Sequence, residues 1–178
     1  DPQLGGTGLT KEQLYSTASF KAKDLQGIGL SHNVLSGWSF FGQNLSGASF
    51  WGAKLAGADL TEAVVTRANF SNTGLTKEQL YSTASSEAKD LQGIDLSAND
   101  LSGWDFGGQN LAEANFHFAT LNSANLSQAN LAGLDFSSAT LTGADLTDAI
   151  VVETSFGATG SHRITKEQLY STASYKAK

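Results

Sequence analysis

The chain has 178 residues, a mass of 18.6 kDa and a net charge of −6, with no cysteine, no methionine and a single proline. This length is enough to bury the core of one domain or of two small ones. The absence of cysteine excludes disulfides, thiolate metal sites and thiol nucleophiles. No apolar run reaches the roughly 18 residues of a membrane span, and the acidic balance argues against non-specific nucleic-acid binding.

Residues 9–22 are predicted to form a short amphipathic helix. Its sequence LTKEQLYSTAS at 9–19 returns at 75–85 and, with one change, at 164–174. Each copy has a threonine followed three residues later by glutamine, which is the pattern of a capping box at a helix start. Helices this short are marginal alone, so each is expected to pack as a lid over the end of a larger structure. The predicted N-caps are Thr10, Thr76 and Thr165.

A large apolar residue occupies every fifth position of residues 23–72 and again of residues 89–158. A period of five fits neither an α-helix nor a strand, but it fits a backbone that turns a corner every five residues. Four such sides close a coil, with the large residue and a small residue two places before it pointing inward. The Ser-Gly and Thr-Gly pairs fit the corners. The predicted core residues are Leu25, Leu30, Leu35, Phe40, Leu45, Phe50, Leu55, Leu60, Val65, Phe70, Leu91, Leu96, Leu101, Phe106, Leu111, Phe116, Leu121, Leu126, Leu131, Phe136, Leu141, Leu146, Val151 and Phe156.

The first coil after each of the first two helices departs from this pattern at the small inward position. An indole does not fit a site the size of alanine, so either that coil is wider or its tryptophan lies against the helix lid. The second arrangement is favoured, because the end of a coil stack exposes unpaired backbone that must be covered. The residues at this position are Lys23, Ile28, Asn33, Trp38 and Gln43, and then Lys89, Ile94, Asn99, Trp104 and Gln109.

Three segments follow the repeating unit A(D/N)LXX: ASFWGAKLAGADL at 48–60, ANFHFATLNSANLSQANLAGLDF at 114–136 and ATLTGADL at 139–146. In these segments the chain resembles the pentapeptide-repeat family. The resemblance implies an all-β solenoid, a right-handed quadrilateral β-helix, here with short α-helices at the N-terminus, in the middle and at the C-terminus. It implies no activity, because proteins that share a scaffold differ in use.

The middle helix, residues 74–88, leaves two arrangements open. It is either an excursion from one continuous rod or a separator between two short towers, and the rod is favoured because it leaves fewer ends to cover. The last helix, residues 164–178, is either a cap or the start of a further unit. The repeated units and the absence of an initial methionine favour a piece of a larger protein, which is compatible with export or with display at the cell surface.

No phosphate-binding loop, zinc-binding motif or nucleophile elbow occurs, so no catalytic, cofactor or metal site is expected. The histidines are scattered and are expected to be solvated surface residues. Four aspartates fall in the outward position of successive pentads, one on each side of one coil. Such a ring spreads charge without pairing two carboxylates, so these side chains are expected to cap corner turns. The residues are His32, His117 and His162, and Asp90, Asp95, Asp100 and Asp105.

The expected function is therefore that of a non-enzymatic structural or protein-interaction scaffold. Some members of the family that this chain resembles are acidic rods that occupy the DNA site of type II topoisomerases, which implies a DNA mimic as the alternative. The net charge is modest for that role, and no face carries a continuous acidic column. The aromatic residues expected to point outward, where a partner protein would meet them, are Phe41, Trp51, His117 and Phe118.

Overall fold

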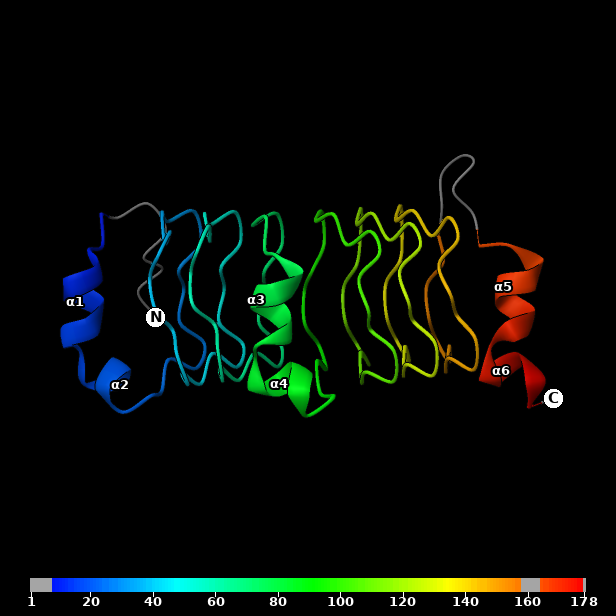
Figure 1. Cartoon of the computed structure of the whole chain (residues 1–178), viewed down its shortest axis with the longest axis horizontal. Helices are drawn as coiled ribbons and strands as arrows, with labels where there is room; N and C mark the ends of the chain where they lie inside the picture. The colour runs from blue at the N-terminus through cyan, green and yellow to red at the C-terminus, as the bar shows by residue number, and fades with distance from the viewer. Residues whose placement is uncertain (1–7, 158–163, 178) are drawn as a thin grey trace. The chain divides into compact units, whose positions relative to one another are not determined.

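The computed structural model describes residues 8–157 and 164–177, which fall into two compact units, Asp1–Ala88 and Lys89–Lys178. Each unit combines a block of coils with short helices and is described by itself (Figure 1). In the described part of the chain, unit 1 contains α1 (Lys11–Ser16), α2 (Ala18–Lys21), α3 (Lys77–Tyr81) and α4 (Ala84–Glu87), and unit 2 contains α5 (Lys166–Ser171) and α6 (Ala173–Lys176).

Parallel bridges join residues that lie 20 apart in the sequence, so each coil has four sides of five residues. The first bridge of unit 1 joins Asp24 to Asn44, and the first bridge of unit 2 joins Asp90 to Asn110. Each side supplies one bridging residue, because the backbone turns before a longer strand forms. Within residues 8–157 and 164–177 the β-structure is therefore a ladder of single bridges rather than a set of extended strands.

Most corners are four-residue turns that start at a buried Leu or Phe, and valine takes this place at Val65 and Val151. At the first corner of unit 1 the Ile28 amide donates to the Leu25 carbonyl at 3.1 Å, and Gly27 between them has a φ of +67°. A positive φ at the third residue is what a type II turn requires, and glycine adopts it without steric cost. The recurring Ser-Gly and Thr-Gly pairs of the sequence occupy these corners.

The interior of each unit is filled by the large residue of each pentad and by the small residue two places before it. Phenylalanine rings of neighbouring coils contact one another along one column: Phe50 and Phe70 of unit 1 stack with centroids 4.9 Å apart, and Phe116 and Phe136 of unit 2 meet edge to face at 5.7 Å. Successive coils rise by about 4.8 Å, the spacing of hydrogen-bonded strands, so equivalent rings in neighbouring coils stay in contact. All the predicted core residues from Leu25 to Leu146 are buried.

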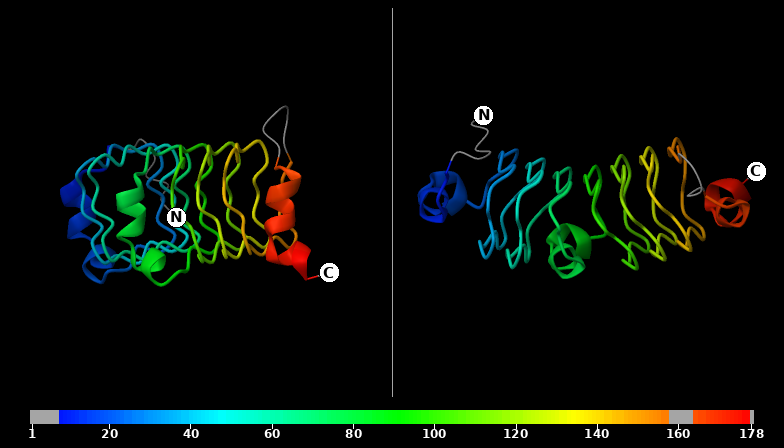
Figure 2. Two further views of the ribbon diagram at one scale, coloured as in Figure 1. Left: turned by 45° about the vertical axis from the view of Figure 1, so that its right-hand side comes forward. Right: turned by 90° about the horizontal axis from the view of Figure 1, so that it is seen from above.

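The helix pair α1–α2 lies across the start of the coils of unit 1 (Figures 1 and 2). The Tyr15 hydroxyl donates to the Ser39 carbonyl at 3.0 Å and accepts a hydrogen bond from the Ser39 amide. The Tyr15 ring stands edge-on to Trp38, with centroids 6.2 Å apart, and Trp38 is buried. The indole in the first coil of unit 1 therefore lies against the helix lid, which is the arrangement that the sequence favours.

The helix pair α3–α4 lies across the last coil of unit 1. The Glu62 amide donates to the Ser82 carbonyl at 2.9 Å, and the Ala84 amide donates to the Ala63 carbonyl at 3.0 Å. These are the ladder bonds that a further coil would make, so the helix pair ends the ladder of unit 1. The two arrangements left open for residues 74–88, an excursion from one continuous rod or a separator between two short towers, stay predictions.

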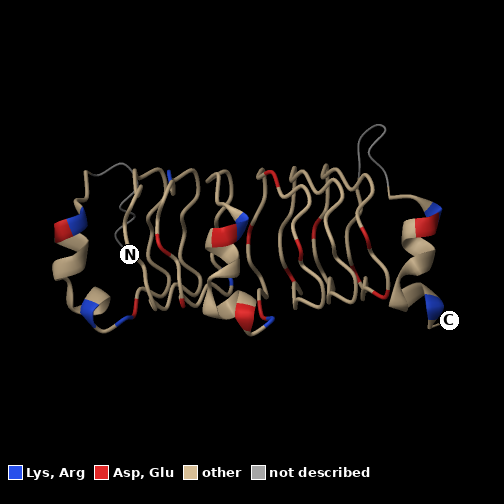
Figure 3. Cartoon of the chain, viewed as in Figure 1, with Lys and Arg blue, Asp and Glu red and all other residues tan. Residues whose placement is uncertain are grey.

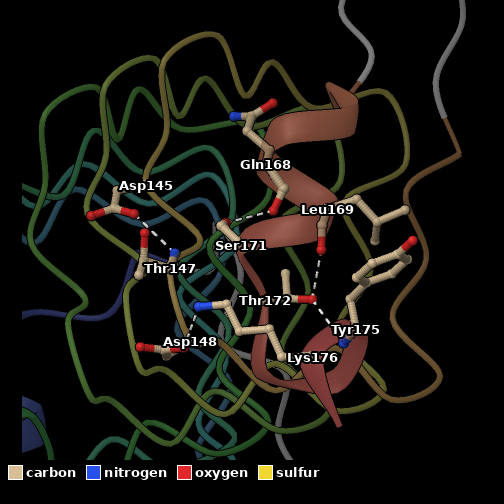
Figure 4. Close-up of polar contacts among 9 residues, drawn as sticks. All are labelled: Asp145, Thr147, Asp148, Gln168, Leu169, Ser171, Thr172, Tyr175 and Lys176. Atoms are coloured by element: carbon tan, nitrogen blue, oxygen red, sulfur yellow. Dashed lines mark hydrogen bonds and ion pairs between the residues drawn. The ribbon is translucent and has the colours of Figure 1, made fainter. Parts of the chain in front are cut away.

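The helix pair α5–α6 closes the last coil of unit 2 through equivalent bonds (Figures 2 and 4). The Asp148 amide donates to the Ser171 carbonyl, and the Ala173 amide donates to the Ala149 carbonyl, both at 2.9 Å. An ion pair of 2.7 Å between Lys176 Nζ and Asp148 adds to this contact at the surface. Because the backbone makes the principal bonds, the lid satisfies ladder groups that a coil end would otherwise expose.

Each segment predicted as one helix is a pair of shorter helices, because a threonine interrupts it. Thr17 has an extended backbone with φ −65° and ψ 152°, and its hydroxyl accepts from the Phe20 amide as the N-cap of α2. At the start of each pair, Thr10, Thr76 and Thr165 form complete capping boxes with the glutamine three residues later. The break lets each pair bend over a coil end that a single straight helix would cover less fully.

Five residues assigned to the interior are not fully buried, and one of them, Ile28, is half-buried in the first coil of unit 1. Lys23 and Lys89 are exposed, and each ammonium group donates to a main-chain carbonyl of the coil instead of pointing inward, as the cost of burying an unpaired charge requires. Val151 and Phe156 are half-buried because they belong to the last coil of unit 2, on which no further coil stacks. Phe156 packs on Phe136 from one side only, with ring centroids 5.3 Å apart.

We expect Leu121→Asp to prevent unit 2 from folding or to lower its free energy of unfolding by more than about 4 kcal/mol, because the substitution buries an unpaired charge. Thr142→Asp places the same charge on an exposed corner and should change the free energy of unfolding by no more than about 0.5 kcal/mol. Urea unfolding followed by circular dichroism measures both. Similar losses for the two variants would contradict the inward and outward orientations of these positions.

Candidate functional site

The described residues contain no arrangement of side chains that fits a catalytic or metal centre. No group of three or more histidine and carboxylate side chains among them is placed to hold a metal ion. The coil interiors are packed, and hollows lie where a helix pair meets a coil end. One hollow of about 290 Å³ beside α1 is lined by Leu9, Leu14 and Ile28 among others, with Asp24 as the one carboxylate of its described lining. The outer surface of the coils is therefore the candidate functional surface.

The coils of unit 2 carry charge of one sign (Figure 3). Residues 90–157, here called the acidic coil block, contain nine acidic and no basic side chains, whereas the rest of the chain contains eight acidic and eleven basic ones. The modest net charge of the whole chain hides this asymmetry. The acidic residues of the block are Asp90, Asp95, Asp100, Asp105, Glu113, Asp135, Asp145, Asp148 and Glu153.

Aspartates at the bridging positions of the acidic coil block accept hydrogen bonds from the corner that follows them. The Asp95 carboxylate accepts from the amide two residues later at 2.9 Å, and Asp135 and Asp145 do the same at 2.7 and 2.9 Å. This is an Asx-turn, in which a short carboxylate satisfies a main-chain donor at a bend. These carboxylates therefore hold the corners and supply the surface charge at the same time.

Asparagine separates the charged residues along the two columns that hold two aspartates each, Asp95 with Asp135 and Asp105 with Asp145. Asn115 Nδ2 donates to the Asp95 carboxylate at 3.2 Å, and Asn125 Nδ2 donates to the Asp105 carboxylate at 2.7 Å. The next aspartate in the Asp95 column is Asp135, two coils away, which corresponds to about 10 Å. The neutral amide between the carboxylates removes the repulsion that two stacked aspartates would suffer.

Hydrogen bonds hold the pKa of several of these carboxyls below the ordinary value of 3.8. For Asp100 the Ser102 hydroxyl and then the Ser102 amide lower the pKa, and for Asp145 the Thr147 hydroxyl and amide do so. For Asp135, burial alone would raise the pKa, but hydrogen bonds from the serine two residues later outweigh it. These three carboxylates therefore stay ionised throughout the neutral pH range.

Exposed aromatic side chains stand at several corners. Phe118 is 63% exposed, Trp51 is 51% exposed and Phe41 is 44% exposed, so all three point outward. Phe41 and Trp51 lie half a coil apart in the same unit, which places them on opposite sides. Scattered exposed apolar residues are ordinary on protein surfaces, so these corners do not define a single patch.

The histidines differ from the expectation at one position. His32 is exposed and lies edge-on to Trp51, with ring centroids 4.4 Å apart. His117 is only half-buried rather than fully solvated, because its ring packs against Phe118 at 4.1 Å and its Nδ1 atom is covered. His162 lies outside the described residues. The two described histidines therefore belong to different aromatic corners and do not meet.

The regular coil, its buried pentads and its corner turns match one known family. The sequence model of pentapeptide repeats matches 8 copies, over residues 40–77, 90–128 and 121–156, which is more than half of the chain. The chain belongs to the pentapeptide-repeat family. This confirms the resemblance given by the A(D/N)LXX segments, and the family implies the right-handed quadrilateral β-helix.

Solved structures of other pentapeptide-repeat proteins are similar to the chain. HetL of Nostoc sp. strain PCC 7120, involved in heterocyst differentiation regulation, is 28% identical over 76% of this chain, with a TM-score of 0.35, and the chain spans 65% of HetL, slightly less than two thirds. A protein of the Arabidopsis thaliana thylakoid lumen is 26% identical over 70% of this chain and 68% of its own, with a TM-score of 0.27. A trypsin-treated form of QnrB1, a plasmid-mediated fluoroquinolone resistance protein, is 15% identical over 77% of this chain and 67% of its own, with a TM-score of 0.24.

No curated protein matches the sequence. Among the residues that the structure describes, every helix is too short and too polar to cross a membrane. The family assignment therefore depends on the repeats themselves, and the repeats do not name a partner.

The acidic coil block is not apparent from the net charge of the whole chain, which shows only a modest acidic balance. The spacing of the pentads predicts just the ring of aspartates at residues 90–105. Charge counted separately in the two coil blocks would have found the block, because no Lys or Arg occurs between residues 90 and 157.

We expect the stability of unit 2 to be constant above about pH 5 and to fall as the pH drops below about 4, because carboxyls with lowered pKa values release protons more readily in the folded state than in the unfolded state. Ser102→Ala removes the hydroxyl bond to Asp100 of 2.6 Å and should weaken this dependence on pH. The urea midpoint at pH 5.5 and 3.5 measures the effect. Asp100→Asn, which keeps a turn acceptor but cannot titrate, is the control, and an acid loss unchanged in both variants would contradict the assignment to Asp100.

Proposed function

We propose that this chain is a non-enzymatic structural or protein-interaction scaffold. Pentapeptide-repeat proteins are generally structural or interaction proteins, which supports this role. The observation that carries the proposal is the division of roles within each pentad, where inward residues pack the coil and outward residues form regular rows. An active site needs a pocket with converging polar groups, and a filled coil with rows of corner residues supplies an extended surface instead.

In this proposal the segments have two kinds of role. The helical segments 9–22, 74–88 and 164–178 act as lids that satisfy the backbone at coil ends. The coil blocks 23–72 and 89–158 supply the surfaces that a partner contacts. The distribution of charge favours the second block, since residues 90–157 contain nine carboxylates and no Lys or Arg.

The proposed partner of the acidic coil block is a protein with a basic surface. Charge of one sign over a whole surface speeds encounter with a partner of opposite charge and disfavours partners of like charge. The aspartates are held in fixed corner positions by their turn hydrogen bonds, so a partner meets a preorganised pattern of charge. Binding to such a surface should weaken as the salt concentration rises.

A second candidate function is a DNA mimic that binds a type II topoisomerase, and the charge density of the acidic coil block favours it. The block of 68 residues makes 3.4 coils and spans about 16 Å at the usual strand spacing. Double-stranded DNA carries one charge per about 1.7 Å of axis, which gives about nine charges over the same length. The nine carboxylates of the block equal this density, although they are distributed around all four sides of the coil.

We expect a variant with four aspartates changed to asparagine to lose capture of its partner in pull-downs from the native source, relative to the unchanged chain. Asparagine fits these corners, because the Asn125 side-chain oxygen accepts the Ser127 amide at 3.0 Å as an aspartate would. A control variant neutralises Asp24 and Asp59 in unit 1. Equal capture by all three proteins would contradict a role for the acidic coil block. The four substitutions are Asp95→Asn, Asp105→Asn, Asp135→Asn and Asp145→Asn.

A supercoiling assay with a bacterial type II topoisomerase separates the two candidates. A DNA mimic inhibits supercoiling, and the inhibition should disappear with the four-asparagine variant and with added salt. If the chain leaves supercoiling unchanged at low salt, the DNA-mimic function is excluded while the scaffold function stands.

A further inference from the structure

The helix pair α5–α6 repeats the sequence of α1–α2 almost unchanged. Residues 165–178 match residues 10–23 except that Tyr175 stands where the earlier copy has Phe20. The two pairs nevertheless sit on different surfaces, since α1–α2 covers the start of the coils of unit 1 and α5–α6 covers the end of the coils of unit 2. One sequence therefore presents two faces that bind two kinds of coil surface.

The first face, here called the end face, binds the last coil of a unit. In α5–α6, Gln168 Nε2 donates to two main-chain carbonyls at 2.8 and 2.9 Å, and the Ser174 hydroxyl accepts from the Val151 amide at 2.9 Å. In α3–α4 the equivalent residues Gln79 and Ser85 make the equivalent bonds to the last coil of unit 1. The bonds that the two end faces share therefore go to main-chain groups, and the Lys176–Asp148 ion pair is an additional contact of α5–α6.

The second face, here called the start face, binds the first coil of a unit and is occupied in α1–α2. Leu14 is buried to 3% exposure, and the Tyr15 hydroxyl pairs with the main chain of Ser39 in both directions. The Tyr15 and Phe20 rings stack at 4.2 Å, and Lys11 Nζ donates to a main-chain carbonyl of the same coil at 3.1 Å. This face combines an apolar contact with hydrogen bonds to the coil.

The start face of α5–α6 is exposed. Leu169, the counterpart of Leu14, is 36% exposed, Tyr170 is 48% exposed and Tyr175 is 39% exposed. Figure 4 shows Leu169 and Tyr175 on the side of the helix pair opposite Asp148. The Tyr170 and Tyr175 rings already stack at 4.4 Å, as their counterparts do in the occupied face. A hollow of about 260 Å³ beside Leu169 and Tyr175 also reaches Val151.

We propose that the start face of α5–α6 binds the first coil of a further pentapeptide-repeat unit joined in tandem after α6, a coil with the sequence pattern of residues 24–43. The occupied start face in unit 1 supplies the template, because the same side chains bind a coil of this pattern there. The stacked tyrosines need little further ordering to receive it, which reduces the entropic cost of docking. This inference goes beyond the scaffold function and does not depend on which protein the coils bind.

The test extends the full chain by a second copy of residues 24–88, fused directly after Lys178, so that this lysine takes the place that Lys23 has in unit 1. The probe is nitration of tyrosine by tetranitromethane, quantified by peptide mapping. In the unextended chain Tyr170 and Tyr175 should react readily. In the extended chain we expect both to react at least about tenfold more slowly, because the copied coil covers them.

A matched set of tyrosine variants tests the hydrogen bond directly. Tyr15→Phe should speed hydrogen exchange of the Ser39 amide, the donor to the Tyr15 hydroxyl, by about tenfold. Tyr170→Phe should change the stability of the unextended chain little, because the exposed Tyr170 hydroxyl bonds to the Tyr175 side chain and not to a coil. In the extended chain the same substitution should speed exchange of the copied Ser39 amide as much as Tyr15→Phe does in unit 1.

Four outcomes would overturn the proposal. The first is equal nitration of Tyr170 in the two chains, and the second is a copied Ser39 amide whose exchange does not respond to Tyr170→Phe. The third is a copied segment that stays unfolded while α5–α6 is intact, since the start face then fails to bind it. The fourth is protection of Tyr170 in the unextended chain that rises with protein concentration, which would assign the face to a second copy of the chain. The scaffold function is unaffected by each of these outcomes.

Discussion

Main-chain hydrogen bonds beside bridged residues 20 apart hold each coil of this chain to the next, because no side is long enough to form a helix or a strand of its own. The ladder needs a corner after every fifth residue, and the corner in turn needs a residue that accepts a positive φ, as at Gly27. Once the corners are fixed, the large residue of each pentad faces the axis. Stacked columns such as Phe116 on Phe136 then bury the apolar surface that stabilises the ladder.

In a ladder of this kind the main-chain amides and carbonyls of each coil pair with those of its neighbours. At the two ends of the ladder, one coil has no neighbour on one side. The helix pairs supply the missing partners, since the main-chain carbonyls of Ser82 and Ser171 accept hydrogen bonds from amides of the last coil of each unit. The same short sequence also covers the first coil of unit 1 through Tyr15 and its stacked neighbour. Two binding faces on one motif explain how a single repeated segment serves at both kinds of coil end.

The outer surface shows how structural and functional demands fall on the same residues. Asp95 and Asp145 satisfy corner amides and at the same time give the acidic coil block its charge. Asn125 makes the same kind of corner bond without charge and pairs with Asp105. An aspartate of a column can therefore be replaced by asparagine without loss of the turn. The fold does not require the concentration of acidic residues in 90–157, which favours a role for them in binding.

The sequence by itself determined the period of five, the inward columns from Leu25 to Leu146 and the capping boxes that start each helix pair, because these depend on local spacing and on neighbouring residues. It did not determine the break at Thr17, since extended and helical backbone compete closely in so short a helix and packing on the coil decides between them. Only the tertiary structure decided which face of the repeated motif is used, because near-identical segments meet different coil surfaces. It also decided the exposure of Val151 and Tyr170, since burial depends on whether a further layer is present and not on the residue's own pentad or helix.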